Sequence, residues 1–418
     1  MIKNRTAIIV LLTALNLLNY IDRMIVAAVL RKIKGPVAEG GLALSNFQAG
    51  ALATAFLLGY FVTSPLFGAR ADKGTRKGLI ALGVAVWSLA TVASGFAESF
   101  TMLIIARVVV GVGEASYATL APTIIDDLTP PESKGRALAI FYLAIPVGSA
   151  LGYVLGGFIE ANWGWRSAFF ICGGPGLVLA LSCLLITEPA RKLREAKGSV
   201  LDGLKTLANI PLFRRAVVGY IAYAAALGAF AHWAPLFIVE RFQASLTDET
   251  ANYYFGLVTV LSGVIGTVVG GQWGDRAQRG LPAVTAETAY DAPANKQGVN
   301  VLLRISALGM VWAAPFAAAA FLMPTPLTFF ACAFLAEIGL FLSTSPVNAI
   351  GLRAVPPELR ASAMAAMIFA IHLFGDLWSP SLLGLLKDLL DPTVAMMALP
   401  ITFALSAWLW WPRRSEAQ

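Results

Sequence analysis

Long apolar runs follow one another along almost the whole chain. A helix that spans a membrane needs about 20 consecutive apolar residues, and only 13% of this chain is charged, against about 25% in a soluble domain. The runs lie at about 6–30, 45–69, 78–97, 100–127, 134–159, 165–187, 215–239, 249–274, 301–323, 326–352, 359–386 and 393–411. The pattern predicts an all-α membrane protein with twelve transmembrane helices. The first run is too long for a cleavable signal peptide and is interpreted as the first helix.

Basic residues are divided unequally between the loops. With the N-terminus placed inside, 23 of the 31 Lys and Arg fall on one side of the membrane and six on the other, while Arg23 and Arg107 lie within spans. This is a positive-inside pattern, so we expect both termini in the cytoplasm. The net charge of +7 is explained by basic loops that face anionic headgroups, and it requires no nucleic acid.

A short polar signature ends one apolar run in each half of the chain. Each copy has a glycine, three further residues, an aspartate and then a base, and we expect each copy in a short basic loop. A carboxylate beside a base suits a switch at a helix end that faces water. We therefore predict a gating motif. Its residues are Gly68, Asp72 and Arg76 in the first copy and Gly271, Asp275 and Arg276 in the second.

A second repeat supports a division into related halves. Pro130-Pro131-Glu132 corresponds to Pro356-Pro357-Glu358, and the difference in spacing matches an extra polar stretch at 277–300, which we expect to be loosely ordered. The sequence predicts a six-helix bundle at 1–187, a cytoplasmic linker with a surface helix at 188–214, and a second six-helix bundle at 215–418. Two such repeats place a substrate site between the halves. In the closed-inside state, Asp72 should approach 356–360 and Asp275 should approach Pro131.

Several polar residues lie where lipid would not tolerate them. Ionisable groups at this depth are costly and usually functional. Arg107 and Glu114 share a helix face about 10.5 Å apart along the axis, so their direct contact is marginal. The other candidates are Asn19, Asp22 and Arg23 in the first span, Glu337 in the tenth, His232, and the i,i+4 pair His372 and Asp376.

These polar residues have two interpretations. Burial favours the neutral form of Glu114 and Arg107 favours the charged form, so the carboxyl group could exchange a proton. Alternatively, Asp22 and Arg23 only neutralise each other, and Arg107 only neutralises a carboxylate. Histidines in such spans are more often satisfied core residues than proton carriers.

Several blocks of sequence resemble the spinster family of the major facilitator superfamily. They are Asn19-Tyr20-Ile21-Asp22-Arg23, the run from Gly111 to Tyr117 with Ala121-Pro122-Thr123, Phe141-Tyr142 with Ala144 to Ser149, and His372 to Asp376 with Ser379-Pro380. The resemblance implies two six-helix bundles that carry lysolipids, including sphingosine-1-phosphate in animal members, with proton coupling in bacterial ones. It assigns Asp22, Arg107 and Glu114 to a central polar site, which Asn19, Arg23, Tyr117, Glu337, His372 and Asp376 would complete. Compact loops suggest a bacterial member in the cytoplasmic membrane.

Two other classes remain open at this point. The same fold could serve a proton-coupled carrier of drugs or small solutes, because fold does not fix function. A membrane acyltransferase is disfavoured, since His372 and Asp376 lie within a span and lack a nucleophile nearby. We therefore expect a secondary transporter and no enzyme, acting as a monomer with a lysolipid or other amphipathic molecule, protons and membrane lipids as partners. We expect no nucleic acid, cofactor or metal.

Overall fold

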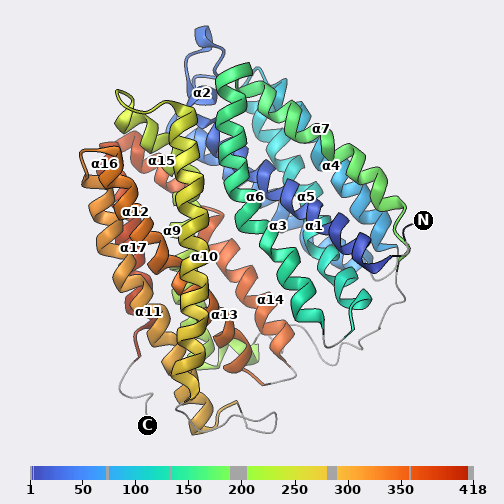
Figure 1. Ribbon diagram of the computed structural model, residues 1–418, viewed down its shortest axis with the longest axis vertical. Coiled ribbons are helices and arrows are strands. Elements are labelled where there is room, and N and C mark those ends of the chain that lie inside the picture. The colour runs from blue at the N-terminus through green and yellow to red at the C-terminus, as the bar shows by residue number, and fades with distance from the viewer. Residues whose placement is uncertain are drawn as a thin grey trace. The chain divides into compact units, whose positions relative to one another are not determined.

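The described part of the chain is almost entirely helical. The computed structural model describes residues 2, 4–71, 75–130, 133–188, 205–279, 290–356 and 359–412. Within these ranges, twelve helices are long and apolar enough to cross a membrane (Figure 1). The prediction of an all-α protein with twelve transmembrane spans is confirmed.

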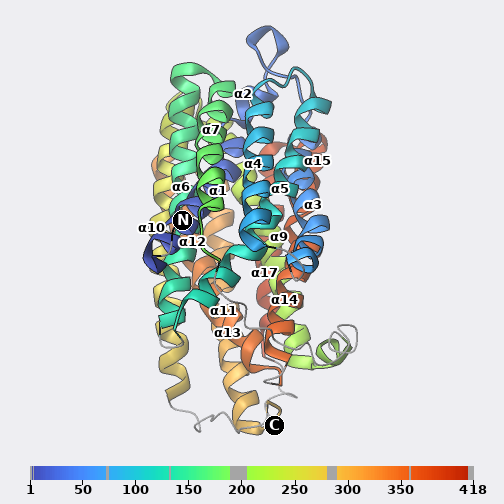
Figure 2. The ribbon, with the colours of Figure 1, turned by 90° about the vertical axis from the view of Figure 1, so that its right-hand side faces the viewer.

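The first half of the chain supplies six long helices and two short ones. Apolar contacts pack α3 on α5, α1 on α6 and α4 on α7 (Figure 2). The elements are α1 (Arg5–Ala28), α2 (Leu30–Lys34), η1 (Val37–Glu39), α3 (Asn46–Ala71), α4 (Arg76–Gly95), α5 (Phe100–Leu128), α6 (Lys134–Trp163) and α7 (Trp165–Leu184).

The second half contains three continuous spans and three interrupted ones. The interruptions occur between α12 and α13, at the π-helical turn η4, and between α16 and α17. The elements are α9 (Pro211–Phe242), α10 (Asp248–Arg279), α11 (Pro293–Leu322), α12 (Pro326–Leu342), α13 (Thr344–Arg353), α14 (Arg360–Ile371), η4 (His372–Asp376), α15 (Ser379–Leu389), α16 (Pro392–Met396) and α17 (Ala398–Trp410).

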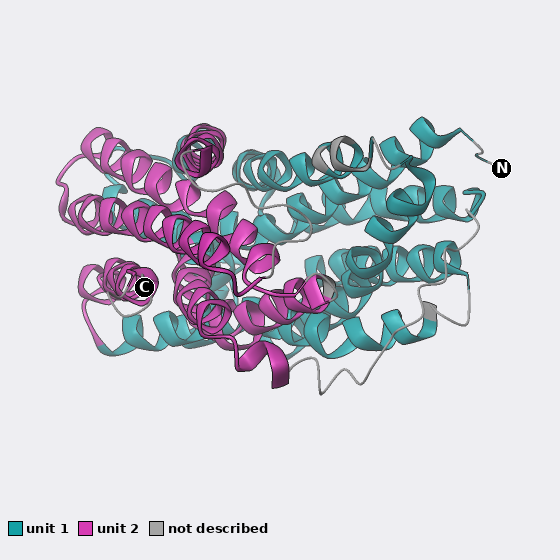
Figure 3. Ribbon diagram, turned by 90° about the horizontal axis from the view of Figure 1, so that it is seen from below, with its two compact units in different colours: residues 1–194, 231–257, 380–389 teal, residues 195–230, 258–379, 390–418 magenta. Residues whose placement is uncertain are grey.

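The chain divides into two compact units (Figure 3). Unit 1 contains Met1–Arg194 together with Ala231–Leu257 and Pro380–Leu389. Unit 2 contains Glu195–Phe230, Val258–Ser379 and Leu390–Gln418. Parts of α9, α10 and α15 thus pack within unit 1, although they belong to the second half of the sequence. The division into six-helix bundles on either side of 188–214 stays a prediction.

Two predicted boundaries are wrong. The signature Gly271–Arg276 lies within α10 and not in a loop, because the helix continues through polar residues to Arg279. The stretch 277–300 is not loosely ordered throughout, since α11 already begins at Pro293, a residue that suits the first turn of a helix. Of the predicted surface helix, only the segment from Lys205 onward falls within the described ranges, where 205–208 are helical.

Glycines allow α3 and α5 to approach closely. A Cβ atom at Gly111 would lie 2.0 Å from the Phe56 carbonyl oxygen, and one at Gly59 would lie 2.2 Å from the Val108 carbonyl oxygen. Only glycine permits this backbone contact. The approach places the aromatic residues of α3 beside the arginine-bearing face of α5.

Candidate polar site in unit 1

Asp22 lies on α1 in an almost fully buried position. Its side chain is 1% exposed, and its Oδ2 accepts a hydrogen bond of 2.6 Å from the Thr91 hydroxyl on α4. Asn19, one turn earlier, is also 1% exposed. Within the described residues, Asp22 Oδ1 and Asn19 Nδ2 make no hydrogen bond. Asp22 Oδ1 can therefore accept a proton or a hydrogen bond, and Asn19 Nδ2 can donate a hydrogen bond to a water or a ligand.

Glu114 forms its ion pair with Arg23 and not with Arg107. Arg23 Nε donates to Glu114 Oε2 over 2.8 Å, and the Glu114 side chain is fully buried. The guanidinium of Arg23 lies 4.9 to 5.2 Å from the ring centroids of Tyr20, Phe56 and Tyr60. Such contacts favour a cation through the ring quadrupole. Asp22 and Arg23 therefore do not pair with each other, since Asp22 bonds to Thr91 and Arg23 pairs with Glu114.

Arg107 is a buried cation with unused donors. It is 2% exposed, and its Cζ atom lies 5.1 Å from the centroid of the Phe56 ring. Among the described residues, Arg107 Nε and Nη1 find no hydrogen-bond acceptor, and Glu114 Oε1 finds no donor. Buried polar groups are nearly always hydrogen-bonded. A buried guanidinium with two free donor nitrogens is therefore suited to an anionic ligand.

Tyr117 belongs to the hydrophobic core next to this cluster. Its hydroxyl donates to the Leu12 carbonyl oxygen, and its ring contacts Trp87 edge to face at 5.7 Å between centroids. The core also includes apolar residues of α1, α4, α5, α6 and α7. The contacts of Tyr117 hold α5 against α1 and so position Glu114, one turn away.

The predicted site residues of the second half lie in unit 2. Glu337 is 4% exposed, and it accepts hydrogen bonds from the hydroxyls of Ser262 at 2.7 Å and Thr259 at 3.5 Å. It borders a small apolar cavity of about 20 Å³. His372 Nδ1 and Asp376 Oδ2 are 2.9 Å apart across η4. These groups form two local pairings within unit 2.

His232 behaves as a core histidine of unit 1. One of its ring nitrogens lies 3.0 Å from the Ala49 carbonyl oxygen, and its side chain is buried. In the described ranges, no group of three or more His, Cys, Asp or Glu side chains could hold a metal ion.

The gating motif is described only in part. Arg76 is buried at the start of α4, where it pairs with Asp127 at 2.7 Å and Glu188 at 3.0 Å. Gly68 lies near the end of α3. Asp275 and Arg276 are exposed near the end of α10. Gly271, one turn earlier, is partly buried. Asp72 and Pro131 lie outside the described residues, so both predicted approaches stay predictions.

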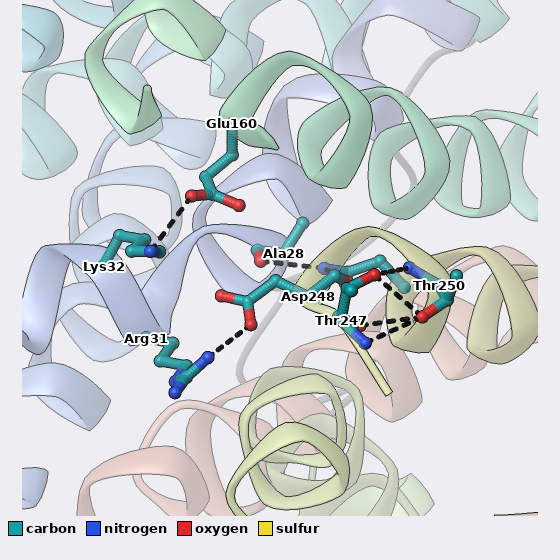
Figure 4. A network of polar contacts seen from close by, with 8 residues as sticks. Ala28, Arg31, Lys32, Glu160, Thr247, Asp248 and Thr250 are labelled. Carbon is teal, nitrogen blue, oxygen red and sulfur yellow. Dashed lines mark hydrogen bonds and ion pairs between the residues drawn. The ribbon is translucent and has the colours of Figure 1, made fainter. Parts of the chain in front are cut away.

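Sequence reasoning missed an ionic network at the other end of unit 1, where α1 leads into α2 (Figure 4). Arg31 Nη1 lies 2.5 Å from Asp248 Oδ1, and Lys32 Nζ lies 3.7 Å from Glu160 Oε1. Asn252 Nδ2 donates to the Ala28 carbonyl oxygen over 3.0 Å. The network therefore joins the first helices of the chain to the start of α10.

The network continues on α9 and α15. Glu240 accepts from both Lys34 at 3.5 Å and Lys387 at 3.3 Å. The Asp388 carboxylate accepts from the backbone N–H groups of Asn46 and Phe47 at the start of α3. One signal in the sequence could have found this network. Six cations lie on the side of the membrane that has few basic residues, and four of them are Arg31, Lys32, Lys34 and Lys387.

The comparisons with known proteins agree with this architecture. The sequence model of the Major Facilitator Superfamily matches residues 12–375. The probable sphingolipid transporter spinster homolog 2 of Arabidopsis thaliana is 32% identical over 93% of this chain and 82% of its own length. Protein spinster homolog 1 of Mus musculus is 34% identical over 92% of this chain and 73% of its own length.

A solved structure has the same fold. The crystal structure of a bacterial homolog to the human lysosomal transporter Spinster, inward-facing and unoccupied, superimposes with a TM-score of 0.81 at 23% identity. The match covers 98% of this chain and 97% of that one. The chain therefore belongs to the spinster family of the Major Facilitator Superfamily and is an integral membrane transporter, not an enzyme.

Proposed function

We propose that this transporter carries lysolipid-like molecules with an anionic headgroup by alternating access, coupled to protons. The observation that carries the proposal is Arg107, a buried arginine whose Nε and Nη1 lack acceptors among the described residues. A planar guanidinium can bind a phosphate through two parallel hydrogen bonds. A relative named as a probable sphingolipid transporter supports this substrate class.

Proton coupling follows from the charge balance of the polar site. Asp22 and Glu114 face Arg23 and Arg107, so the four groups sum to zero when all are ionised. Protonation of one carboxylate leaves an excess positive charge, which an anionic headgroup would neutralise. Conversely, the loss of that proton would weaken the anion site. Proton and substrate binding are thereby linked through the same four side chains, and linkage of this kind is reciprocal.

Alternating access is supported by the segments of the second half that pack in unit 1. The ion pairs Arg31–Asp248, Lys34–Glu240 and Lys387–Glu240 join sequence-distant helices at one end. Breaking them would release α9, α10 and α15 from the first half of the chain. We place this end outside and both termini in the cytoplasm of a bacterial cell, because 23 Lys and Arg fall on the side of the termini.

The decisive experiment measures transport into proteoliposomes with a panel of lysolipids, with and without an imposed pH gradient. Asp22→Asn and Glu114→Gln keep side-chain size but remove the titrating groups, so gradient-driven uptake should fall sharply while membrane insertion is kept. Glu337→Gln tests the buried carboxylate of unit 2 separately, since this carboxylate has hydroxyl donors and no cation partner among the described residues. Full gradient response in both test variants would contradict the coupling role and direct attention to Glu337 or Asp376.

A carrier of cationic amphipathic drugs or small solutes is the second candidate. Glu337 favours it, because this buried carboxylate accepts hydrogen bonds only from hydroxyl groups among the described residues and could pair with a cationic substrate. Competition between a phosphorylated lysolipid and a cationic amphiphile in a binding assay separates the candidates. Displacement by the cation only in protein with Glu337 intact would favour the second one.

A further inference from the structure

A basic hollow lies on the surface of unit 2 at the start of α11. The hollow has a volume of about 700 Å³, and the starts of α9 and α11 line it together with Pro412. Its basic residues are Lys296 and Arg304, and its acidic residue is Asp291. All three side chains are exposed. The lining therefore carries a net positive charge.

Arg304 is the residue of this hollow that most needs an anion. It lies on α11 about three residues inside the apolar run 301–323, close to the end of the span. Neither Arg304 nor Lys296 forms an ion pair within the described ranges. An arginine near the end of a span reaches the headgroup layer, where its charge can pair with a lipid phosphate. Lys296 is two turns nearer the helix start and adds a second positive charge.

An apolar groove continues from the hollow along the same helix. The groove has a volume of about 480 Å³, and Val311, Ala314, Ala404 and Trp408 are among its lining residues. Pro412 borders both the hollow and the groove, so the two are contiguous. They follow the seam between α11 and α17, which pack side by side (Figure 1). Val311 is two turns beyond Arg304 and shares its helix face.

We propose that this combined surface binds one anionic membrane phospholipid, with its phosphate on Arg304 and an acyl chain in the groove. The order of the parts matches the molecule. The charges of Lys296 and Arg304 come first along α11. An apolar channel edged by the exposed Trp408 begins about 10 Å beyond Arg304. Tryptophan is typical of the interfacial layer of a membrane. Lys296 favours an anionic headgroup over a zwitterionic one.

This lipid site differs from the polar site of unit 1 and does not depend on the proposed substrate. Its lining residues belong to unit 2, and the transport proposal assigns them no role. The site can therefore exist whether or not the protein carries lysolipids, and it can be tested by binding alone.

The test uses thermal unfolding of the full chain in detergent with phosphatidylglycerol or with phosphatidylcholine of the same acyl chains. A lipid that binds the folded state raises the melting temperature, and the rise grows with the logarithm of the lipid concentration divided by its Kd. Arg304→Gln should weaken the apparent affinity for phosphatidylglycerol at least about tenfold, because a charge-assisted bond is lost. Lys296→Gln should weaken it less. The shift of melting temperature caused by phosphatidylcholine should change little in either variant.

The matched control is Arg279→Gln, which removes an equal charge from an exposed position on α10 outside the hollow. It should retain wild-type affinity. An equal loss in Arg279→Gln and Arg304→Gln would show that net charge decides the response, and would overturn the site.

A lipid with a brominated acyl chain tests the groove directly. Bromine should quench part of the tryptophan fluorescence, and Trp408→Phe should reduce that quenched fraction. Unchanged quenching in Trp408→Phe would mean that the acyl chain lies elsewhere, and it would refute the groove.

Discussion

Replacing Arg107 with lysine separates phosphate recognition from simple charge neutralisation. The guanidinium offers Nε and Nη1, both without acceptors among the described residues, so it can donate two bonds to one phosphate. Lysine keeps the charge but loses the planar fork. The loss of one charge-assisted hydrogen bond costs about 1.5–3 kcal/mol, which corresponds to roughly 10- to 150-fold weaker binding.

The assay is equilibrium binding of a phosphorylated lysolipid to the purified protein at fixed pH, in parallel with an uncharged monoacylglycerol. Arg107→Lys should weaken only the phosphorylated ligand. Arg23→Lys is the matched control, since the Arg23 guanidinium already donates to Glu114 and lysine can still pair with that carboxylate. Wild-type affinity of Arg107→Lys for the phosphorylated ligand would refute the headgroup role, and an equal loss for both ligands would indicate a packing effect.

Two further outcomes test the packing of α3 on α5 and the ionic network. Gly111→Ala should destabilise the protein by at least about 1–3 kcal/mol through overpacking, because the new Cβ would lie 2.0 Å from the Phe56 carbonyl oxygen. Gly174→Ala has nothing within 4 Å, so thermal unfolding should show it unchanged or slightly stabilised. Charge reversal at Arg31 or at Asp248 alone should increase labelling of a cysteine introduced at that end, and reversal of both should restore protection. If neither single reversal changes the extent of cysteine labelling, the Arg31–Asp248 pair does not help to close that end.

Hydropathy predicted the spans well but not the ends of the helices. A run of apolar residues marks where a helix crosses lipid, whereas a helix continues for as long as its backbone hydrogen bonds do. In α10 the polar residues up to Arg279 remain helical, and α11 starts at Pro293, before its apolar run. The prediction of a loop at Gly271–Arg276 was wrong for this reason.

The polar cluster shows a different limit of sequence reasoning. Depth and residue type identified Asp22, Arg107 and Glu114 as candidates, because lipid penalises them individually. Their partners depend on distances between helices, from α1 to α4 for Asp22 and from α1 to α5 for Glu114. The pairing of Glu114 with Arg23, 91 positions away, has no local signal. The pairing of Arg31 with Asp248 spans 217 positions and has none either.

We expect dissolved salt to act on the ionic network and, through it, on transport. Arg31 and Lys32 side chains are 40% and 48% exposed, so mobile ions reach their pairs, while the Lys387 side chain is only 1% exposed. The screening length falls from about 8 Å at 0.15 M to about 3 Å at 1 M. A saline medium would thus loosen the Arg31–Asp248 and Lys32–Glu160 pairs more than the Lys387–Glu240 bridge, in which the lysine is buried and Glu240 is 34% exposed. The same transporter would cycle differently in fresh and in salt water without any change of sequence.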